Sequence, residues 1–292
     1  GDGFSYCNAA FPDDWVNNNN DLDPFCDTND SDDCNVCAGD NSSCCTDPRA
    51  DEYLALGICE YTYTLELQDG ANLISYWGLP QDKSVESMLS SLEGNVNSII
   101  GQAIASQPHE TNGWVGSISQ IDPLKGYWLK LDEPIEYLIT ATQLTPSDTI
   151  FQIIEGPNLI SFPYSGDCEI NEIIPQEWES CITSIIGESI AATPIQGIGW
   201  TGSLSHLRGG KGYWINSDCI TEFNFDVSNC SSHLSRIDRL DYNEDVYQSL
   251  EQSFYFIEDI DNIEAGDIVS SYCNGIKVGS RVWDGAYTDI PA

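Results

Sequence analysis

An internal repeat with a spacing of 86 residues constrains the fold of this chain more than any other feature. Asn72–Ser75 recurs at Asn158–Ser161, and Gly126–Trp128 recurs at Gly212–Trp214, so both motifs repeat after 86 positions. Other pairs at this spacing are Ser98–Gly101 and Ser184–Gly187, Pro108 and Pro194, Trp114 and Trp200, Ser117 and Ser203, and Lys125 and Lys211. Solenoid and propeller units repeat after only roughly 20 to 50 residues. Each copy is therefore expected to be a small domain with its own core.

Each copy is predicted to be mostly antiparallel β structure with one short helix. The predicted strands lie at 64–67, 96–100, 113–119 and 126–131 in the first copy, at 150–153 in the second, and at the Asn-Leu-Ile-Ser segments after Gly70 and Gly156. Apolar residues at helical spacing predict a helix at 84–92, which Ser84 can cap. Its counterpart at 170–178 contains Pro175, and proline disfavours a helix interior.

The segments before and after the repeats differ from them in composition. Residues 1–60 hold seven cysteines and hardly any aliphatic periodicity, so disulfides, bound cations or both must stabilise them. Residues 231–292 contain strand patterns at 254–257 and 268–269 and a hairpin turn at Asn274 and Gly275. A module of about 60 residues is marginal alone. We therefore expect that further polypeptide or a neighbouring subunit completes it.

The predicted fold class is mainly β, with tandem small antiparallel β modules, each with a short helix, preceded by a disulfide-rich irregular segment. The predicted domains are 1–60, 61–146 (repeat 1), 147–230 (repeat 2) and 231–292 (the C-terminal module). No stretch of the sequence approaches the roughly 18 apolar residues of a membrane span, so membrane insertion is not expected.

The charge of the chain excludes one class of partner. Asp and Glu total 47 against 10 Lys and Arg, which gives a formal net charge of −37. Proteins bind nucleic acid through Lys and Arg and the release of counterions, so nucleic acid is excluded as a partner. Anionic lipid surfaces are disfavoured for the same reason. The charge instead favours solubility in salt, divalent cation binding, or both.

The 12 cysteines indicate an oxidising compartment, because thiols at this density are kept as disulfides outside the cytosol. We expect local disulfides between Cys168 and Cys181 and between Cys219 and Cys230. The remaining disulfide candidates are Cys7, Cys26, Cys34, Cys37, Cys44, Cys45, Cys59 and Cys273. Because seven of these lie near the N-terminus, either Cys273 pairs with one of them, within or between chains, or two thiols stay free. A zinc site at Cys34, Cys37, Cys44 and Cys45 is disfavoured by its short central loop.

Closely spaced acidic residues in the N-terminal segment are candidates for calcium binding. Calcium takes six to eight oxygen ligands, and carboxylates and amides supply them. The candidate ligands are Asp21, Asp23, Asp27, Asn29, Asp30, Asp32 and Asp33. Their spacing does not match the EF-hand pattern. A solvated acidic loop without calcium explains the same residues.

The repeated aromatic residues have two interpretations. On β domains, exposed rings can stack on sugars, and the candidates for glycan stacking are Trp114, Trp128, Trp200 and Trp214. Residues kept in both copies are more simply explained by packing in two related cores. We therefore expect these aromatic residues to lie mainly in the core.

The sequence contains no recognisable catalytic constellation. The three histidines, His109, His206 and His233, are scattered, and no metalloprotease, nucleophile-elbow or phosphate-loop motif is present. We predict that the chain is not an enzyme. Asn29, Asn41 and Asn229 open N-x-Ser sequons, which are glycosylated only if the host performs this modification.

Three segments resemble modules of large secreted surface proteins of environmental bacteria. Residues 33–44 resemble their Asp- and Cys-rich repeats, and the two copies resemble modules that carry N-L-I-S, W-x-G-S-L and G-K-G-Y-W motifs. Residues 254–260, 278–283 and 285–291 resemble a third recurrent module. The resemblance implies secretion, surface display and adhesion rather than catalysis.

Together these features predict a secreted structural or adhesive protein of the cell surface. Such a protein associates with itself or with other surface proteins, as the subunit of an extracellular filament or layer. The alternative is a carbohydrate-binding accessory region of a larger secreted enzyme, with glycans as ligands.

Overall fold

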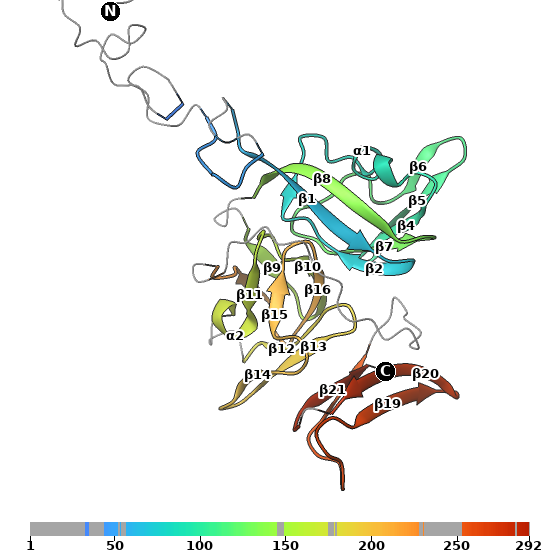
Figure 1. Ribbon diagram of the computed structural model, residues 1–292, viewed down its shortest axis with the longest axis vertical. Helices are drawn as coiled ribbons and strands as arrows, with labels where there is room; N and C mark the ends of the chain where they lie inside the picture. Colours follow the sequence, from blue (N-terminus) through green and yellow to red (C-terminus); the bar gives the residue numbers. More distant parts are fainter. Residues whose placement is uncertain are drawn as a thin grey trace, which may run out of the picture. The chain divides into compact units, whose positions relative to one another are not determined.

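The computed structural model describes residues 33–34, 44–51, 53, 57–144, 149–174, 178, 180–227, 230, 253–283 and 285–291 (Figure 1). The chain divides into two compact units, Gly1–Thr62 and Tyr63–Ala292. The fold is mainly β, with several small antiparallel sheets and, in the described part, two α-helices of one turn each. No helix within these ranges is long and apolar enough to cross a membrane.

Repeat 1 contains two antiparallel sheets. Its elements are β1 (Glu60–Leu67), β2 (Gly70–Ile74), β3 (Gly78–Leu79), α1 (Val85–Met88), η1 (Ser90–Leu92), β4 (Val96–Gly101), β5 (Ile104–His109), β6 (Gly113–Gly116), β7 (Tyr127–Leu131) and β8 (Ile135–Gln143). One sheet has the strand order β2-β7-β4-β5-β6, and the other has the order β1-β8-β3. The residues of β1 alternate in burial, so Tyr63, Leu65 and Leu67 face the core, as the alternation in the sequence predicts.

Repeat 2 reproduces the five-stranded sheet of repeat 1. Its elements are β9 (Phe151–Ile153), β10 (Gly156–Ser161), β11 (Asp167–Glu169), α2 (Ile170–Ile173), β12 (Ile182–Ile186), β13 (Ala191–Ile195), β14 (Gly199–Thr201), β15 (His206–Arg208), β16 (Gly212–Ser217) and β17 (Thr221–Phe223). The strand order β10-β16-β12-β13-β14 matches that of repeat 1 strand for strand. Sequence equivalence at a spacing of 86 residues therefore corresponds to structural equivalence.

The asparagine of each Asn-Leu-Ile-Ser motif holds the turn that precedes it. The side chain of Asn72 accepts a hydrogen bond from the Gln68 amide at 2.7 Å and donates to the Gln68 carbonyl at 2.8 Å. Asn158 makes the same two bonds with Ile154, at 2.9 and 2.8 Å. Both side chains are buried. A buried amide with these partners satisfies backbone groups that the tight turn leaves unpaired.

The predicted helix of repeat 1 is confirmed, and the helix of repeat 2 is shorter than predicted. The hydroxyl of Ser84 accepts a hydrogen bond from the Ser87 amide and caps α1, and η1 follows it to Leu92. In repeat 2, α2 ends at Ile173 instead of continuing to residue 178. A residue that precedes a proline avoids the helical conformation, and Pro175 follows directly after Ile174 in the sequence.

The C-terminal module contains β18 (Phe254–Ile257), β19 (Ile268–Cys273), β20 (Ile276–Val282) and β21 (Thr288–Pro291). β18 pairs with β21, and β19 pairs with β20, both in antiparallel fashion. The predicted hairpin turn is confirmed: Asn274 and Gly275 connect β19 to β20 with φ angles of 50° and 83°. Asparagine and glycine tolerate such positive φ angles better than other residues.

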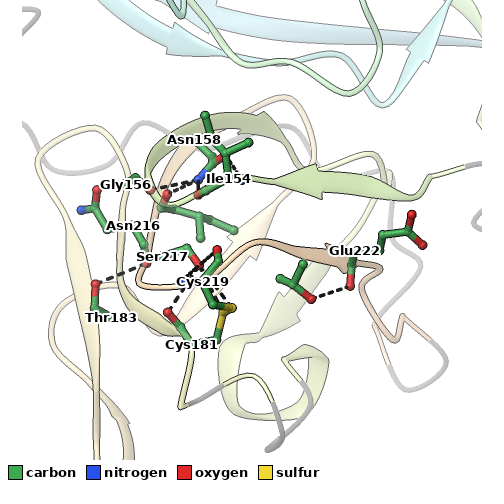
Figure 2. Close-up of a disulfide and its surroundings, with 11 residues drawn as sticks. Ile154, Gly156, Asn158, Cys181, Thr183, Asn216, Ser217, Cys219 and Glu222 are labelled. Atoms are coloured by element: carbon green, nitrogen blue, oxygen red, sulfur yellow. Dashed lines mark hydrogen bonds between the residues drawn. A yellow bond between two sulfur atoms is a disulfide. The ribbon is translucent and has the colours of Figure 1, made fainter.

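The disulfides of repeat 2 differ from the local pairs that we expected. Cys168 pairs with Cys230, and Cys181 pairs with Cys219, which corrects the expected Cys168–Cys181 and Cys219–Cys230 pairs. Figure 2 shows Cys181 and Cys219 with Ser217 between neighbouring strands. Because Ile182 pairs with Ser217 in the β12–β16 ladder, the residues just beyond this pair are brought together. Strand register therefore determined the pairing more than distance along the chain did.

The N-terminal segment contains two disulfides that the structure describes. Cys34 pairs with Cys44, and Cys45 pairs with Cys59. Cys273 is exposed and unpaired within the described part of the chain. The other candidates, Cys7, Cys26 and Cys37, lie outside the described residues.

Disulfide mapping of the protein is expected to recover the Cys168–Cys230 and Cys181–Cys219 pairs. Replacing both Cys181 and Cys219 by serine is expected to lower the free energy of unfolding by about 4 kcal/mol, because the bond closes a long loop in the unfolded chain. Peptide mass spectrometry and chemical denaturation measure the two effects. Recovery of a Cys168–Cys181 peptide would contradict the strand register described above.

Buried tyrosines predict a loss of stability at high pH. Burial raises the pKa values of Tyr127 and Tyr137 to about 12, and it also raises the pKa values of Tyr63, Tyr76 and Tyr213. In the unfolded chain a tyrosine titrates near pH 10. A pKa that is higher in the folded state stabilises the fold below about pH 10, and this stabilisation is lost as the pH rises towards 12.

We therefore expect the free energy of unfolding to fall steeply above about pH 10. Tyrosinate absorbance and circular dichroism, recorded together against pH, measure this effect. The buried tyrosines should ionise only as the fold is lost. Ionisation of all tyrosines near pH 10 with an intact fold would contradict the burial described here.

Candidate functional site: the module interfaces

Repeats 1 and 2 meet through equivalent residues on both sides. Ile74 forms a β-bridge with Lys211, and Ile160, its counterpart, forms a β-bridge with Lys125, the counterpart of Lys211. An interface in which residue i contacts j while the equivalent of j contacts the equivalent of i has the form of a two-fold symmetric dimer. The two repeats are thus joined as the subunits of a homodimer are, but within one chain.

The repeated serines supply hydrogen bonds in both directions across this interface. The Ser75 amide donates to the Gly210 carbonyl at 2.9 Å, and the Ser161 amide donates to the Leu124 carbonyl at 3.1 Å. The hydroxyl of Ser75 donates to the carbonyl of Lys211 at 2.6 Å, and that of Ser161 donates to the carbonyl of Pro123 at 2.6 Å. Both serines are fully buried. These residues therefore satisfy their own polar groups through the other repeat.

A second pair of equivalent contacts lies at the β-hairpin turns. The Leu159 amide donates to the side-chain oxygen of Gln102 at 2.9 Å, and the Leu73 amide donates to Glu188 at 3.1 Å. Gln102 and Glu188 are themselves 86 positions apart. Glu188 also lies 3.7 Å from the ammonium group of Lys211. Each turn thus binds the edge of the opposite repeat.

An apolar cluster fills the centre of the interface. Leu73 from repeat 1, its equivalent Leu159 from repeat 2, and Trp128 are all at most 2% exposed. Trp214, the equivalent of Trp128, packs against them and is partly buried. The Asn-Leu-Ile-Ser and Gly-Tyr-Trp motifs therefore recur because they build both sides of one interface.

The glycine of each Gly-Tyr-Trp motif allows the two backbones to approach. A Cβ atom at Gly126 would lie 2.8 Å from the carbonyl oxygen of Ile160, and one at Gly212 would lie 2.7 Å from that of Ile74. Neither distance is compatible with a side chain unless the backbones separate. Residues other than glycine at these positions would push the repeats apart.

Two of the four candidate tryptophans are buried and two are partly exposed. Trp128 is 2% exposed in the interface cluster, and Trp200 is 7% exposed in the core of repeat 2. Their rings pack against protein, which leaves little surface for a sugar. Trp114 on β6 and Trp214 on β16 are partly exposed, and Trp214 packs against the interface cluster. The tyrosines of the Gly-Tyr-Trp motifs are buried as well, consistent with the expected role in packing.

The C-terminal module contacts repeat 2 through a buried carboxylate. Asp289 on β21 is 1% exposed, and it accepts hydrogen bonds from the amide and the hydroxyl of Ser203, both at 2.7 Å. Arg281 lies 3.3 Å from this carboxylate and also donates to the carbonyl oxygen of Ser189. Burial raises the pKa of Asp289, while Arg281 and Ser203 oppose this rise. Sequence reasoning missed Asp289, because one aspartate among 47 acidic residues carries no signal of its own.

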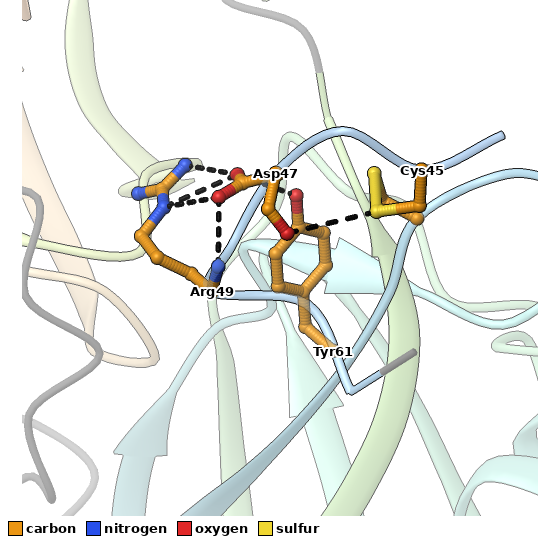
Figure 3. A network of polar contacts seen from close by, with 5 residues as sticks. Cys45, Asp47, Arg49 and Tyr61 are labelled. Atoms are coloured by element: carbon orange, nitrogen blue, oxygen red, sulfur yellow. Dashed lines mark hydrogen bonds and ion pairs between the residues drawn. A yellow bond between two sulfur atoms is a disulfide. The ribbon is translucent and has the colours of Figure 1, made fainter. Parts of the chain in front are cut away.

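In the N-terminal segment, the carboxylate of Asp47 is held by an arginine. Arg49 binds Asp47 through two side-chain nitrogens, and the Tyr61 hydroxyl donates to the same carboxylate at 2.8 Å (Figure 3). The hydrogen bond from the Arg49 side chain is the main reason that the pKa of Asp47 lies well below its usual value. This network lies next to Cys45, whose disulfide to Cys59 closes the segment.

Of the seven calcium candidates, the described residues include Asp33. Asp33 is exposed. Asp21, Asp23, Asp27, Asn29, Asp30 and Asp32 lie outside the described residues. Within the part of the chain that is described, no three His, Cys, Asp or Glu side chains are grouped to hold a metal ion.

Comparison of the chain with known proteins gave no match to a family model, to a curated protein or to a solved structure.

Replacement of Gly126 by alanine is expected to destabilise the protein by about 1 to 3 kcal/mol, the usual cost of forcing atoms into a packed region. Gly212→Ala should have a similar effect at the equivalent position. Gly187→Ala is the control, because its added methyl group meets only side chains of its own repeat, at 3.1 Å or more. Chemical denaturation measures all three variants. Equal stability of Gly126→Ala and Gly187→Ala would contradict the close approach.

Proposed function

We propose that this protein is a secreted structural component of a cell surface, whose copies associate into an extracellular filament or layer. The proposal rests on the contacts that the repeated residues make between modules. Leu73, Ser75, Gly126, Trp128 and their equivalents join one β module to the next. A chain whose most characteristic residues join modules is suited to building an assembly.

The disulfides support a location outside the cell. Four are present among the described residues, and they indicate an oxidising environment. Secretion is the route by which most disulfide-bonded proteins reach such an environment. Bonds of this kind also preserve a fold where no chaperone can repair it.

The exposed apolar residues of the C-terminal module support association with other molecules. Ile268, Tyr272, Ile276 and Val282 on the β19–β20 hairpin are 67%, 65%, 58% and 53% exposed. Large apolar surfaces exposed to water often mark sites of interaction with other molecules. A neighbouring subunit that covers this hairpin would remove these side chains from water.

The acidity of the chain supports calcium as a regulator of association. Copies that each carry a net charge of −37 repel one another, and divalent cations bound at the Asp-rich segment would reduce this repulsion. We therefore propose residues 21–33 as the calcium ligands. The proposal of a structural role does not depend on it.

The full chain, purified with its disulfides intact, is expected to form assemblies whose mass increases with protein concentration. Light scattering and electron microscopy detect them, and parallel samples with calcium and with a chelator test the role of the ion. Reduction of the disulfides is the control for the folded state. A protein that stays monomeric at all concentrations, with and without calcium, would overturn the proposal.

A further inference from the structure

We propose that repeat 1 carries a second docking surface for the C-terminal module, which the C-terminal module of a neighbouring copy occupies. The repeat 1 docking surface consists of Ala103–Ala105 and Gly116–Ser117. Its counterpart, the repeat 2 docking surface, consists of Ser189–Ala191 and Gly202–Ser203 and is covered by the chain's own C-terminal module. This inference deepens the proposed function, since it names the contact through which copies associate.

Three contacts define how the repeat 2 docking surface is covered. The carboxylate of Asp289 binds the amide and hydroxyl of Ser203, and Arg281 donates to the carbonyl oxygen of Ser189. The Phe256 ring lies 3.1 Å from the position that a Cβ atom of Gly202 would occupy. The partner of such a surface thus presents a carboxylate, a guanidinium group and an aromatic ring.

The backbone of repeat 1 has the same shape at the equivalent positions. Ala103 and Ser189 both have a φ angle of 60°, and Gly116 and Gly202 have φ angles of 142° and 131°. A Cβ atom at Gly116 would lie 2.2 Å from the Ala105 carbonyl oxygen, and one at Gly202 would lie 2.3 Å from the equivalent oxygen of Ala191. Ser189, whose carbonyl accepts from Arg281, and Gly202, which contacts Phe256, therefore have counterparts of the same backbone conformation in Ala103 and Gly116.

The serine hydroxyl that binds Asp289 also recurs in the same setting. Ser117 Oγ accepts a hydrogen bond from the Ala105 amide at 3.0 Å, as Ser203 Oγ does from the Ala191 amide at 3.3 Å. The hydroxyl proton of Ser203 is donated to Asp289 at 2.7 Å, whereas that of Ser117 makes a longer bond of 3.3 Å to the Ala105 carbonyl. A carboxylate placed at Ser117 would accept a shorter, charge-assisted hydrogen bond.

The two surfaces differ in exposure. Ala191 is fully buried, while the equivalent Ala105 is exposed, as are Ala103, Gly116 and Ser117. Ile104, at the centre of the repeat 1 docking surface, is 39% exposed. Repeat 1 thus presents to solvent a surface that repeat 2 uses for binding.

One difference explains why the chain's own module occupies repeat 2. In repeat 2, the carbonyl oxygen of Ala191 accepts a hydrogen bond from the Leu204 amide. The Ser203 amide is therefore free to donate to Asp289. In repeat 1, the Ser117 amide donates to the Ala105 carbonyl at 2.8 Å. A module on repeat 1 would gain the hydroxyl bond at once and the amide bond only after a local shift. Repeat 2 is therefore the stronger of the two sites.

The chain has one C-terminal module and two docking surfaces. The segment that connects repeat 2 to this module is long enough for the module to bind a neighbouring copy. The 22 residues between Cys230 and Ser253 give a maximum reach of about 75 Å. A module that leaves its own repeat 2 and binds the repeat 1 of a neighbour regains the equivalent contacts except the serine amide bond, so part of the cost of leaving is recovered, as in domain swapping. At the high local concentration of an assembly, this exchange links one copy to the next.

The test uses a full-length variant, Ser203→Glu, in which like charges expel Asp289 from repeat 2. We expect this variant to form oligomers of at least twice the monomer mass at concentrations where the unaltered chain is monomeric. Adding Ser117→Glu should abolish these oligomers. Adding Thr111→Glu instead, on the exposed β5–β6 turn of the same repeat, is the matched control and should leave them unchanged. Light scattering measures the masses, and circular dichroism verifies folding.

Cross-linking identifies the occupant directly. A photoreactive residue at position 103 of the Ser203→Glu variant, in an equal mixture of ¹⁴N and ¹⁵N copies, is expected to give mixed-isotope cross-links to peptides from residues 253–291. Cross-links within single copies only, cross-links to other regions, or oligomers that survive Ser117→Glu would overturn the inference. If Ser203→Glu does not fold, Ser203→Ala removes one hydrogen bond and should produce a smaller shift in the same direction.

The failure of this inference and the failure of the proposed function have different signatures. If the unaltered chain assembles and Ser117→Glu assembles equally well, the repeat 1 docking surface is not the contact, and the structural role stands. If the unaltered chain never assembles, the structural role fails, while the cross-linking of Ser203→Glu still decides whether repeat 1 binds the module.

Discussion

The close backbone approach at Gly126 and Gly212 is the constraint on which the arrangement of the two repeats depends. With no Cβ atom at either position, the carbonyls of Ile160 and Ile74 lie where a side chain would otherwise be. Only at this separation do the buried serines reach the loop of the opposite repeat. The hydrogen bonds, in turn, remove the cost of burying strand-edge groups away from water. The glycine, the serine and the leucine of each motif therefore form one structural unit.

Duplication explains why the motifs are the most strictly repeated parts of the sequence. In this interface, each motif residue of one repeat makes the contact that its equivalent makes from the other repeat. A substitution in one repeat must therefore still fit the unchanged partner residue in the other. The turn residues Gln102 and Glu188 differ, yet they accept hydrogen bonds from the equivalent amides of Leu159 and Leu73. Side-chain oxygens at this position are interchangeable, whereas the glycines are not. Divergence has thus occurred where the geometry tolerates it.

Much of the fold could be predicted from the sequence, and the omissions have physical causes. Alternation, turn residues and the Ser84 cap located β1, β2, α1 and the Asn274 hairpin, because these signals are local. The strand β8 and the disulfide pairs were not located, because they depend on contacts between distant segments. The strand β5 was missed although its partner β4 is adjacent in sequence, because β5 is largely exposed and lacks the alternation that marks a strand. The expected packing is seen for Trp128, Trp200 and the two tyrosines, whereas Trp114 and Trp214 are partly exposed. The place of Trp128 at an interface between modules could not be read from one copy alone. Asp289 was missed because its role exists only where two modules meet.

The two repeats stabilise the same five-stranded sheet by different means. Repeat 1 covers it with the long strands β1 and β8, of 8 and 9 residues, and with paired rings such as Tyr63 with Trp77 and Tyr76 with Tyr137. In repeat 2 the corresponding strands β9 and β17 have only 3 residues each. Repeat 2 instead contains two disulfides, Cys168–Cys230 and Cys181–Cys219, which repeat 1 lacks. Because a cross-link lowers the entropy of the unfolded chain, it can replace apolar area that a small core lacks. The two repeats thus share the five-stranded sheet and differ in the strands and cross-links that accompany it.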